Sequence, residues 1–179
     1  ETPDEARVVD LFRQSLMHAW RALYRWTVTE GLRRMDMDRE DDSDIAPDLS
    51  ATLNAIRDAN QRGIYLLLDA HPYLGYASYQ RALRDLIQRR GSHQHMLVLI
   101  GTKVEVPEAL EPFAVRFSLR LPDANALLKL VKDEAREYAL QNGGRRVEAD
   151  ADAVRQIVRN LQGLTLTDAR RIARHLIYR

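Results

Sequence analysis

Two short runs of consecutive apolar residues, at 64–68 and at 96–100, dominate the hydropathy pattern of the chain. Runs without polar alternation are typical of parallel strands that helices cover on both faces. Between them, residues 76–90 carry apolar side chains at a helical spacing. We therefore expect a strand–helix–strand unit inside a three-layer α/β domain with a parallel sheet.

The flanking pattern predicts four further elements and one loop. A helix is expected from about Pro3 to Leu23, followed by a strand at 24–29 whose alternation suits one exposed face, as at the edge of a sheet. Residues 35–43 form an acidic loop without the glycine and glutamate spacing of a calcium-binding loop. The remaining elements are a helix from Pro47 to Gly63 and a strand at 115–121.

After Pro122 the pattern is helical only. Candidate N-terminal caps precede three predicted helices: Asp123, Asp150 or Asp152, and Thr167. Glycines at 143–144 and at 163 are expected to end the first two. We place a domain boundary here, with an α/β domain over residues 1–122 and a small helical domain over 123–179.

Composition excludes several classes of protein. The chain has 179 residues, a net charge of +1 and no cysteine, which rules out disulfides, thiolate metal sites and cysteine nucleophiles. Its apolar runs are about five residues long, whereas a membrane span needs about 20. No secretory signal is visible, so a cytoplasmic location is expected. The near-neutral charge disfavours general nucleic-acid binding, although 24 of 27 basic residues are arginine.

The carboxyl ends of the two apolar strands carry the candidate chemistry, because ligands of α/β sheets bind there. Asp69 follows the first strand and could hold a magnesium-bound water, and Thr102 follows the second and could contact a phosphate. Taken singly, each is also a common turn or cap residue. Four arginines farther along are candidates for ion pairs or phosphate contacts: Arg116, Arg120, Arg170 and Arg171.

The order of these segments resembles the AAA+ superfamily over nearly the whole chain. The matching segments are 64–69 for the Walker B strand, 97–102 for the strand with the first sensor residue, 106–110 with 116–117 for the arginine region and fifth strand, 121–123 for the junction to the lid, and 163–171 for the helix of the second sensor arginine. The resemblance implies a P-loop-NTPase-like sheet with a helical lid. It also implies nucleotide-facing or magnesium-facing positions for Asp69, Thr102, Arg170 and Arg171, and interface or arginine-finger positions for Arg116 and Arg120.

A narrower resemblance concerns residues 2–5, 26–31 and 68–74. They are similar to the first half of an AAA+ family of bacteria, cyanobacteria and algal plastids, in which a degenerate half precedes a complete ATPase half. This resemblance implies that the rest of the parent chain is a partner, that ATP and magnesium bind in the parent protein, and that a homo-oligomer is possible.

Departures from the AAA+ pattern affect the chemistry. A P-loop needs a glycine-rich turn followed by lysine and a hydroxyl residue, but the three lysines, at 103, 129 and 132, do not follow a glycine. Ala70 stands where Walker B has its glutamate, and His71 is interpreted as a turn residue rather than a substitute base. We therefore expect no ATP hydrolysis and no cofactor in this fragment.

The first strand of an AAA+ sheet lies in its interior, yet a helix starting at Pro3 leaves no room for it. We expect either that this strand lies upstream of Glu1 or that another segment fills its position, because an empty position would leave backbone groups of two neighbouring strands unpaired. Three functions stay open: a non-hydrolysing module for assembly, regulation or protein interaction, an ATPase domain whose P-loop lies upstream, and a clamp-loader-like nucleic-acid module.

Overall fold

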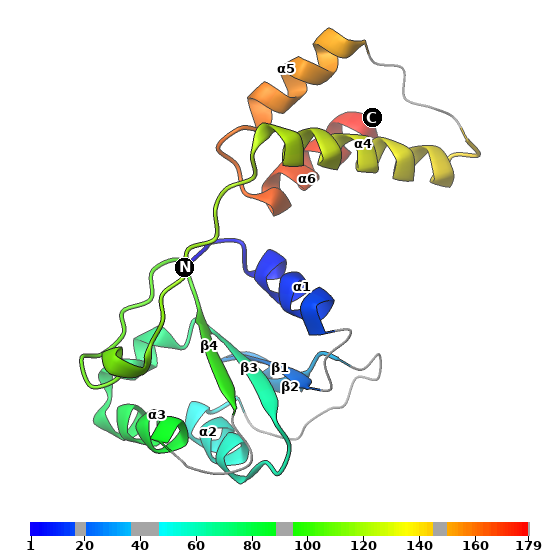
Figure 1. Ribbon diagram of the computed structural model, residues 1–179. Coiled ribbons are helices and arrows are strands. Elements are labelled where there is room, and N and C mark those ends of the chain that lie inside the picture. The colour runs from blue at the N-terminus through cyan, green and yellow to red at the C-terminus, as the bar shows by residue number, and fades with distance from the viewer. Residues whose placement is uncertain (17–20, 37–46, 89–94, 145–149, 179) are drawn as a thin grey trace. The chain divides into compact units, whose positions relative to one another are not determined.

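The computed structural model divides the chain into two compact units, residues 1–118 and 119–179. The first unit is α/β, and the second contains helices (Figure 1). The structure describes residues 1–16, 21–36, 47–88, 95–144 and 150–178. Most of the predicted acidic loop at 35–43 lies outside these ranges.

The α/β unit is built on a four-stranded sheet with the order β2-β1-β3-β4. Its strands are β1 (Ala22–Thr27), β2 (Gly31–Arg34), β3 (Gly63–Leu68) and β4 (Met96–Ile100). β3 pairs in parallel with both β1 and β4, and β2 pairs antiparallel with β1. The predicted α/β sheet is confirmed and is mostly parallel.

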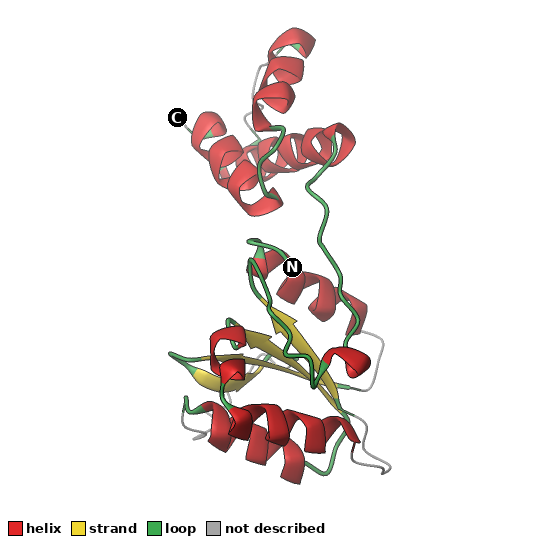
Figure 2. Cartoon of the chain, turned by 90° about the vertical axis from the view of Figure 1, so that its left-hand side faces the viewer, coloured by secondary structure: helices red, strands yellow, loops and turns green. Residues whose placement is uncertain are grey.

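Helices cover both faces of this sheet, as the three-layer prediction requires (Figures 1 and 2). α1 (Glu5–Leu16) lies on one face, and α2 (Leu49–Asp58) and α3 (Ala77–Gln88) lie on the other. β3 is buried along its whole length because its side chains enter the apolar clusters of both faces. This double burial explains why its sequence shows no alternation.

Two N-terminal predictions are wrong. β1 lies in the interior of the sheet rather than at an edge, with Trp26 fully buried. The edge belongs to β2, which the chain reaches through a turn at Gly31, where φ is +73° and glycine is favoured. α1 also ends at Leu16 instead of Leu23, because Ala22 already begins β1.

The strand predicted at 115–121 is wrong as well. These residues are in no strand, and Val115 is 78% exposed. The four described strands are hydrogen-bonded neighbours in the order β2-β1-β3-β4, so no empty position lies between any two of them. An alternating sequence becomes a strand only where a neighbour supplies backbone partners. Among the described residues, no strand lies on the outer edge of β4 that 115–121 could join.

The helical unit contains α4 (Ala124–Gln141), α5 (Ala151–Leu161) and α6 (Leu166–Ile177). Asp123 and Asp150 cap α4 and α5 as predicted, since each side chain accepts a backbone N–H of its helix. α6 is capped by Thr165, not by Thr167. Of the described helices, none combines the length and apolar character needed to cross a membrane.

Candidate functional site

The ends of β3 and β4 bring Asp69 next to the residues that follow β4. The backbone N–H of Asp69 donates to the carbonyl of Ile100 at 2.9 Å. A Cβ added to Gly101 would lie 3.2 Å from Oδ1 of Asp69 and 3.2 Å from Nδ1 of His71. Both side chains therefore lie close over Gly101, and a larger residue there would displace them.

A second carboxyl group, that of Glu5 in the first turn of α1, meets Asp69 at this position. Burial, then the negative charge of Asp69, then a hydrogen bond with its carboxyl group raise the pKa of Glu5, while the positive charge of Arg25 opposes the rise. Two carboxyl groups form a hydrogen bond only when one of them holds a proton. The position beside Asp69 therefore favours the protonated form of the Glu5 carboxyl group.

At the start of α1, side chains of the same chain accept backbone N–H groups of the helix end. The hydroxyl of Thr2 accepts the N–H of Asp4 at 3.0 Å, and the carboxylate of Asp4 accepts the N–H of Arg7 at 3.3 Å. Thr2 and Asp4 are both buried. Phosphate groups bind helix N-termini through free backbone N–H groups. Two of those groups at the start of α1 already have side-chain partners.

We expect Glu5→Gln to weaken the pH dependence of stability. In the chain without the substitution, the raised pKa of Glu5 adds stability. This stability is complete below the ordinary pKa of 4.5 and is lost as pH rises through the pKa of Glu5 in the folded state. Glutamine cannot ionise and keeps an N–H donor for Asp69. The melting temperature of the variant should be higher than that of the unsubstituted chain, and the difference should grow from about pH 4 to pH 7. A constant difference over this range would contradict the role given to Glu5.

A hollow of about 660 Å³ opens beside the same strand ends. Thr102 is exposed on its wall, and Lys103 and Glu105 form an exposed ion pair at 2.7 Å. His71 also lines it and begins the short 3₁₀ helix η1 (His71–Gly75), in agreement with the predicted turn. Its Nδ1 is buried and has no hydrogen-bond partner among the described residues. Asp69 and Thr102 thus lie at one end of the sheet.

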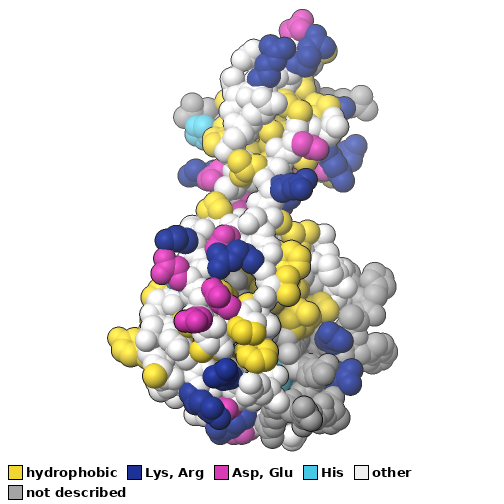
Figure 3. Space-filling view, turned by 60° about the vertical axis from the view of Figure 1, so that its left-hand side comes forward, with side chains coloured by type: hydrophobic (Ala, Val, Ile, Leu, Met, Phe, Trp, Pro, Cys, Tyr) yellow, Lys and Arg dark blue, Asp and Glu magenta, His cyan; other side chains and the backbone are white. Residues whose placement is uncertain are grey.

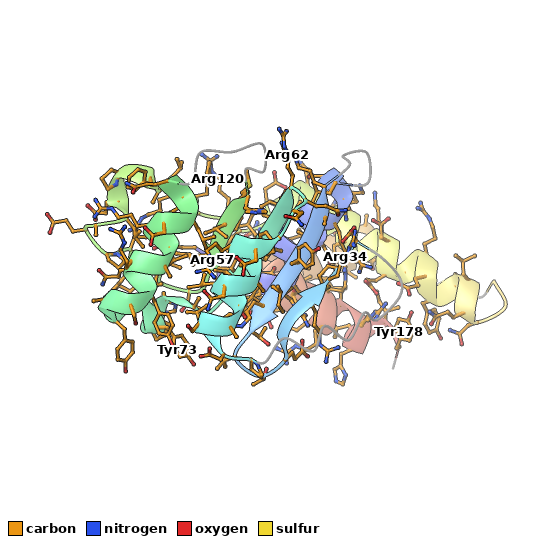
Figure 4. The ribbon with its side chains drawn as sticks, turned by 90° about the horizontal axis from the view of Figure 1, so that it is seen from below. Arg34, Arg57, Arg62, Tyr73, Arg120 and Tyr178 are labelled. Atoms are coloured by element: carbon orange, nitrogen blue, oxygen red, sulfur yellow. The ribbon has the colours of Figure 1, made fainter. Side chains whose placement is uncertain are left out.

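Arg116 and Arg120 fall on either side of the division between the two units. Nη1 of Arg116 donates to Oε1 of Glu1 at 2.8 Å, an ion pair within the α/β unit. Arg120, labelled in Figure 4, is exposed in the stretch that leads into α4.

The predicted sensor arginines belong to an ion-pair cluster inside the helical unit. Glu134 of α4 is 4% exposed and lies between two arginines of α6. Nε of Arg170 is 3.2 Å from Oε1 of Glu134, and Nε of Arg174 is 2.7 Å from Oε2. Arg171 pairs with Asp168 at 3.0 Å. Both sensor candidates are therefore engaged by carboxylates of their own unit.

Sequence reasoning missed Glu5 and Glu134. The contact of Glu5 with Asp69 depends on how α1 packs on the sheet, which no local pattern reveals. Glu134 did have a signal, because it continues the apolar stripe of Leu127, Leu130 and Val131 at helical spacing. A charged residue on such a stripe indicates a buried carboxylate that needs a basic partner.

The three-layer α/β unit, with Asp69 after β3 and Thr102 shortly after β4, followed by a helical unit, agrees with the resemblance to the AAA+ superfamily. The family model for the N-terminal domain of SpoVK-like AAA ATPases matches residues 1–119, and the model for their second domain matches residues 125–179. The chain belongs to the SpoVK-like AAA ATPases and is part of an AAA+ ATPase. Comparison with curated proteins and with solved structures found no match.

Proposed function

We propose that this chain is a non-hydrolysing AAA+-like module that serves assembly, regulation or protein interaction within a larger AAA+ ATPase. Residues 1–122 act as a degenerate α/β subdomain and residues 123–179 as its lid. The observation that carries the proposal is that Ala70, which stands where Walker B has its glutamate, is buried in the apolar core directly after Asp69.

The residues of this site do not fit a magnesium–triphosphate group. Carboxylates such as that of Asp69 suit magnesium, but a triphosphate needs free backbone N–H groups, and the side chains of Thr2 and Asp4 already accept two of those at the start of α1. Ala70, where Walker B has glutamate, is 1% exposed and belongs to the apolar core. Phosphoryl transfer depends on positive groups and a positioned water, and these residues supply neither.

The arginines are assigned to protein contacts. Arg116 and Arg120 are exposed and are proposed to contact the rest of the parent ATPase or a second copy. Arg170 and Arg171 lie on α6 of the proposed lid. Arg170 forms an ion pair with Glu134, and Arg171 forms one with Asp168. Arginine suits such contacts because its planar guanidinium can bind a carboxylate through two parallel hydrogen bonds.

The proposal predicts that ATP with magnesium does not stabilise this chain. We expect no rise in melting temperature at millimolar ATP and no phosphate release above the protein-free rate. Asp69→Ala should leave both results unchanged, as should the control Asp85→Ala on the exposed face of α3. A micromolar affinity for ATP that Asp69→Ala abolishes and Asp85→Ala does not would overturn the proposal in favour of a nucleotide-binding domain.

A further inference from the structure

Asn142 directly follows the last residue of α4 and is the one asparagine of the sequence that precedes a glycine. Its backbone N–H donates to the carbonyl of Tyr138 at 3.0 Å, and Nδ2 of its side chain donates to the same carbonyl at 2.9 Å. The N–H of Gly144 donates to the carbonyl of Ala139 at 2.8 Å. The side-chain amide of Asn142 is therefore a hydrogen-bond donor at a helix end, where carbonyl groups need donors from outside the helix.

The chain directly after Asn142 is open to solvent and free to rotate. Gly143 and Gly144 have positive φ angles of +64° and +88°, and a Cβ added to either would meet no atom within 4 Å. Asn142 and both glycines are exposed. Glycine has no side chain that restricts backbone rotation or shields its nitrogen. The backbone nitrogen of Gly143 can therefore reach Cγ of Asn142 when the helix end opens.

The last turn of α4 lies largely at the surface of its unit. Figure 3 shows hydrophobic side chains on that surface, and Leu140 is 78% exposed. Tyr178, labelled in Figure 4, connects this turn to the end of α6. Its hydroxyl donates to Oε1 of Gln141 at 3.2 Å, and its ring packs edge-on against Tyr138 with centroids 5.0 Å apart. Because Tyr178 is itself 40% exposed, local opening of this helix end costs little free energy.

We propose that Asn142 is a modification site that converts to aspartate and isoaspartate without an enzyme, and that the conversion loosens the contact between the ends of α4 and α6. The backbone nitrogen of Gly143 gives up its proton to solvent and bonds to Cγ of Asn142. The bond between Cγ and Nδ2 breaks, and Nδ2 takes up a proton and leaves as ammonia. Water then opens the cyclic imide at either of its two carbonyls, so water is the sole co-reactant. The proposal does not depend on whether the module binds nucleotide.

The product reverses the role of this side chain at the helix end. A carboxylate has no N–H to donate to the carbonyl of Tyr138, and its negative charge is repelled by the negative end of the helix dipole. Isoaspartate also lengthens the backbone by one carbon atom, which interrupts the bonds that close the last turn. Tyr138 and Gln141 both lie in this turn, so the two contacts of Tyr178 weaken with it.

The first test is a peptide map by mass spectrometry of the full chain after incubation at neutral pH. The other four asparagines serve as internal controls: Asn54, Asn60, Asn125 and Asn160. We expect the change from amide to acid at Asn142 to be faster than at any of these on the order of tenfold, with isoaspartate among the products. A rate at Asn142 no higher than at the controls overturns the proposal.

Gly143→Ala tests which nitrogen attacks. A Cβ hinders the approach of the backbone nitrogen to Cγ of Asn142, so the reaction should slow on the order of tenfold. Alanine at a positive φ would also loosen the helix end, and for this reason the two rates are compared in the urea-unfolded chain, where only the hindrance remains. An unchanged rate in the variant overturns the proposed reaction.

A matched pair of variants tests the effect on the helical unit. Asn142→Asp should speed hydrogen exchange of the backbone amides in 138–144 and 175–178 on the order of tenfold. Asn160→Asp adds the same charge at an exposed position of α5 and should leave both segments unchanged. Equal acceleration in the two variants, or none in Asn142→Asp, overturns the proposed link between the modification and the contact of α4 with α6.

Discussion

Glu134→Lys is expected to unfold the helical unit. The carboxylate of Glu134 is the shared partner of Arg170 and Arg174, and its side chain is 5% exposed. Lysine would place a third positive charge between the two arginines and leave that charge without a partner. Breaking a buried ion pair costs about 3–5 kcal/mol, which is a large part of the stability of a small helical unit. Hydrogen exchange of α4 and α6 should show the loss while β1 and β3 stay protected.

Glu137→Lys is the matched control, one helical turn farther along α4. Its carboxylate accepts from Arg174 at 3.0 Å, but its side chain is 43% exposed, so water and salt weaken the pair. Exposed ion pairs contribute about 0–1 kcal/mol, and the control should stay folded. Equal losses of stability in the two variants would contradict the prediction that the burial of Glu134 makes its substitution the more costly one.

Trp26→Ala is expected to have the largest effect on the α/β unit. Trp26 is fully buried in the interior strand β1 and packs edge-on against Tyr73, with ring centroids 6.1 Å apart (Tyr73 is labelled in Figure 4). Replacing a buried aromatic residue by alanine costs about 3–5 kcal/mol through lost burial and the cavity left behind. The change should appear as a lower urea midpoint, measured by circular dichroism.

Trp26→Phe serves as its control. The indole N–H is buried and has no hydrogen-bond partner among the described residues, so phenylalanine forfeits no such bond there. It keeps an aromatic ring against Tyr73 and should lose clearly less stability than alanine. A loss as large as that of Trp26→Ala would mean that the packing around β1 depends on the full indole ring.

Local sequence predicted the elements that an apolar run or a capping residue marks. β3 and β4 are consecutive apolar runs, and Asp123 and Asp150 each cap a helix by accepting the N–H three residues farther along. The structures of residues 24–29 and 115–121 were harder to predict, because apolar and polar side chains alternate in both segments. One became an interior strand and the other stayed unpaired, since pairing depends on neighbours that are distant in sequence.

The candidate site divides in the same way. That Asp69 and Thr102 lie near one another follows from two parallel strands ending at one edge, which the sequence predicts. The side chains that Asp69 and Arg170 contact in the structure could not be predicted in this way. Glu5 reaches Asp69 from another layer, and Arg170 meets Glu134 from a helix 36 residues away along the chain. Such pairs are set by packing between elements.

Because Arg170 pairs with Glu134, its guanidinium can either keep this ion pair or bind an anion in its place. An anion arriving at the lid has to compete with the carboxylate of Glu134 for the same guanidinium. Arg174 keeps its own bond to that carboxylate, so Arg170 can change partners without stranding a buried charge. Release of Arg170 would remove one of the ties between α4 and α6, and the looseness of that helix pair would then report on what the arginine has bound.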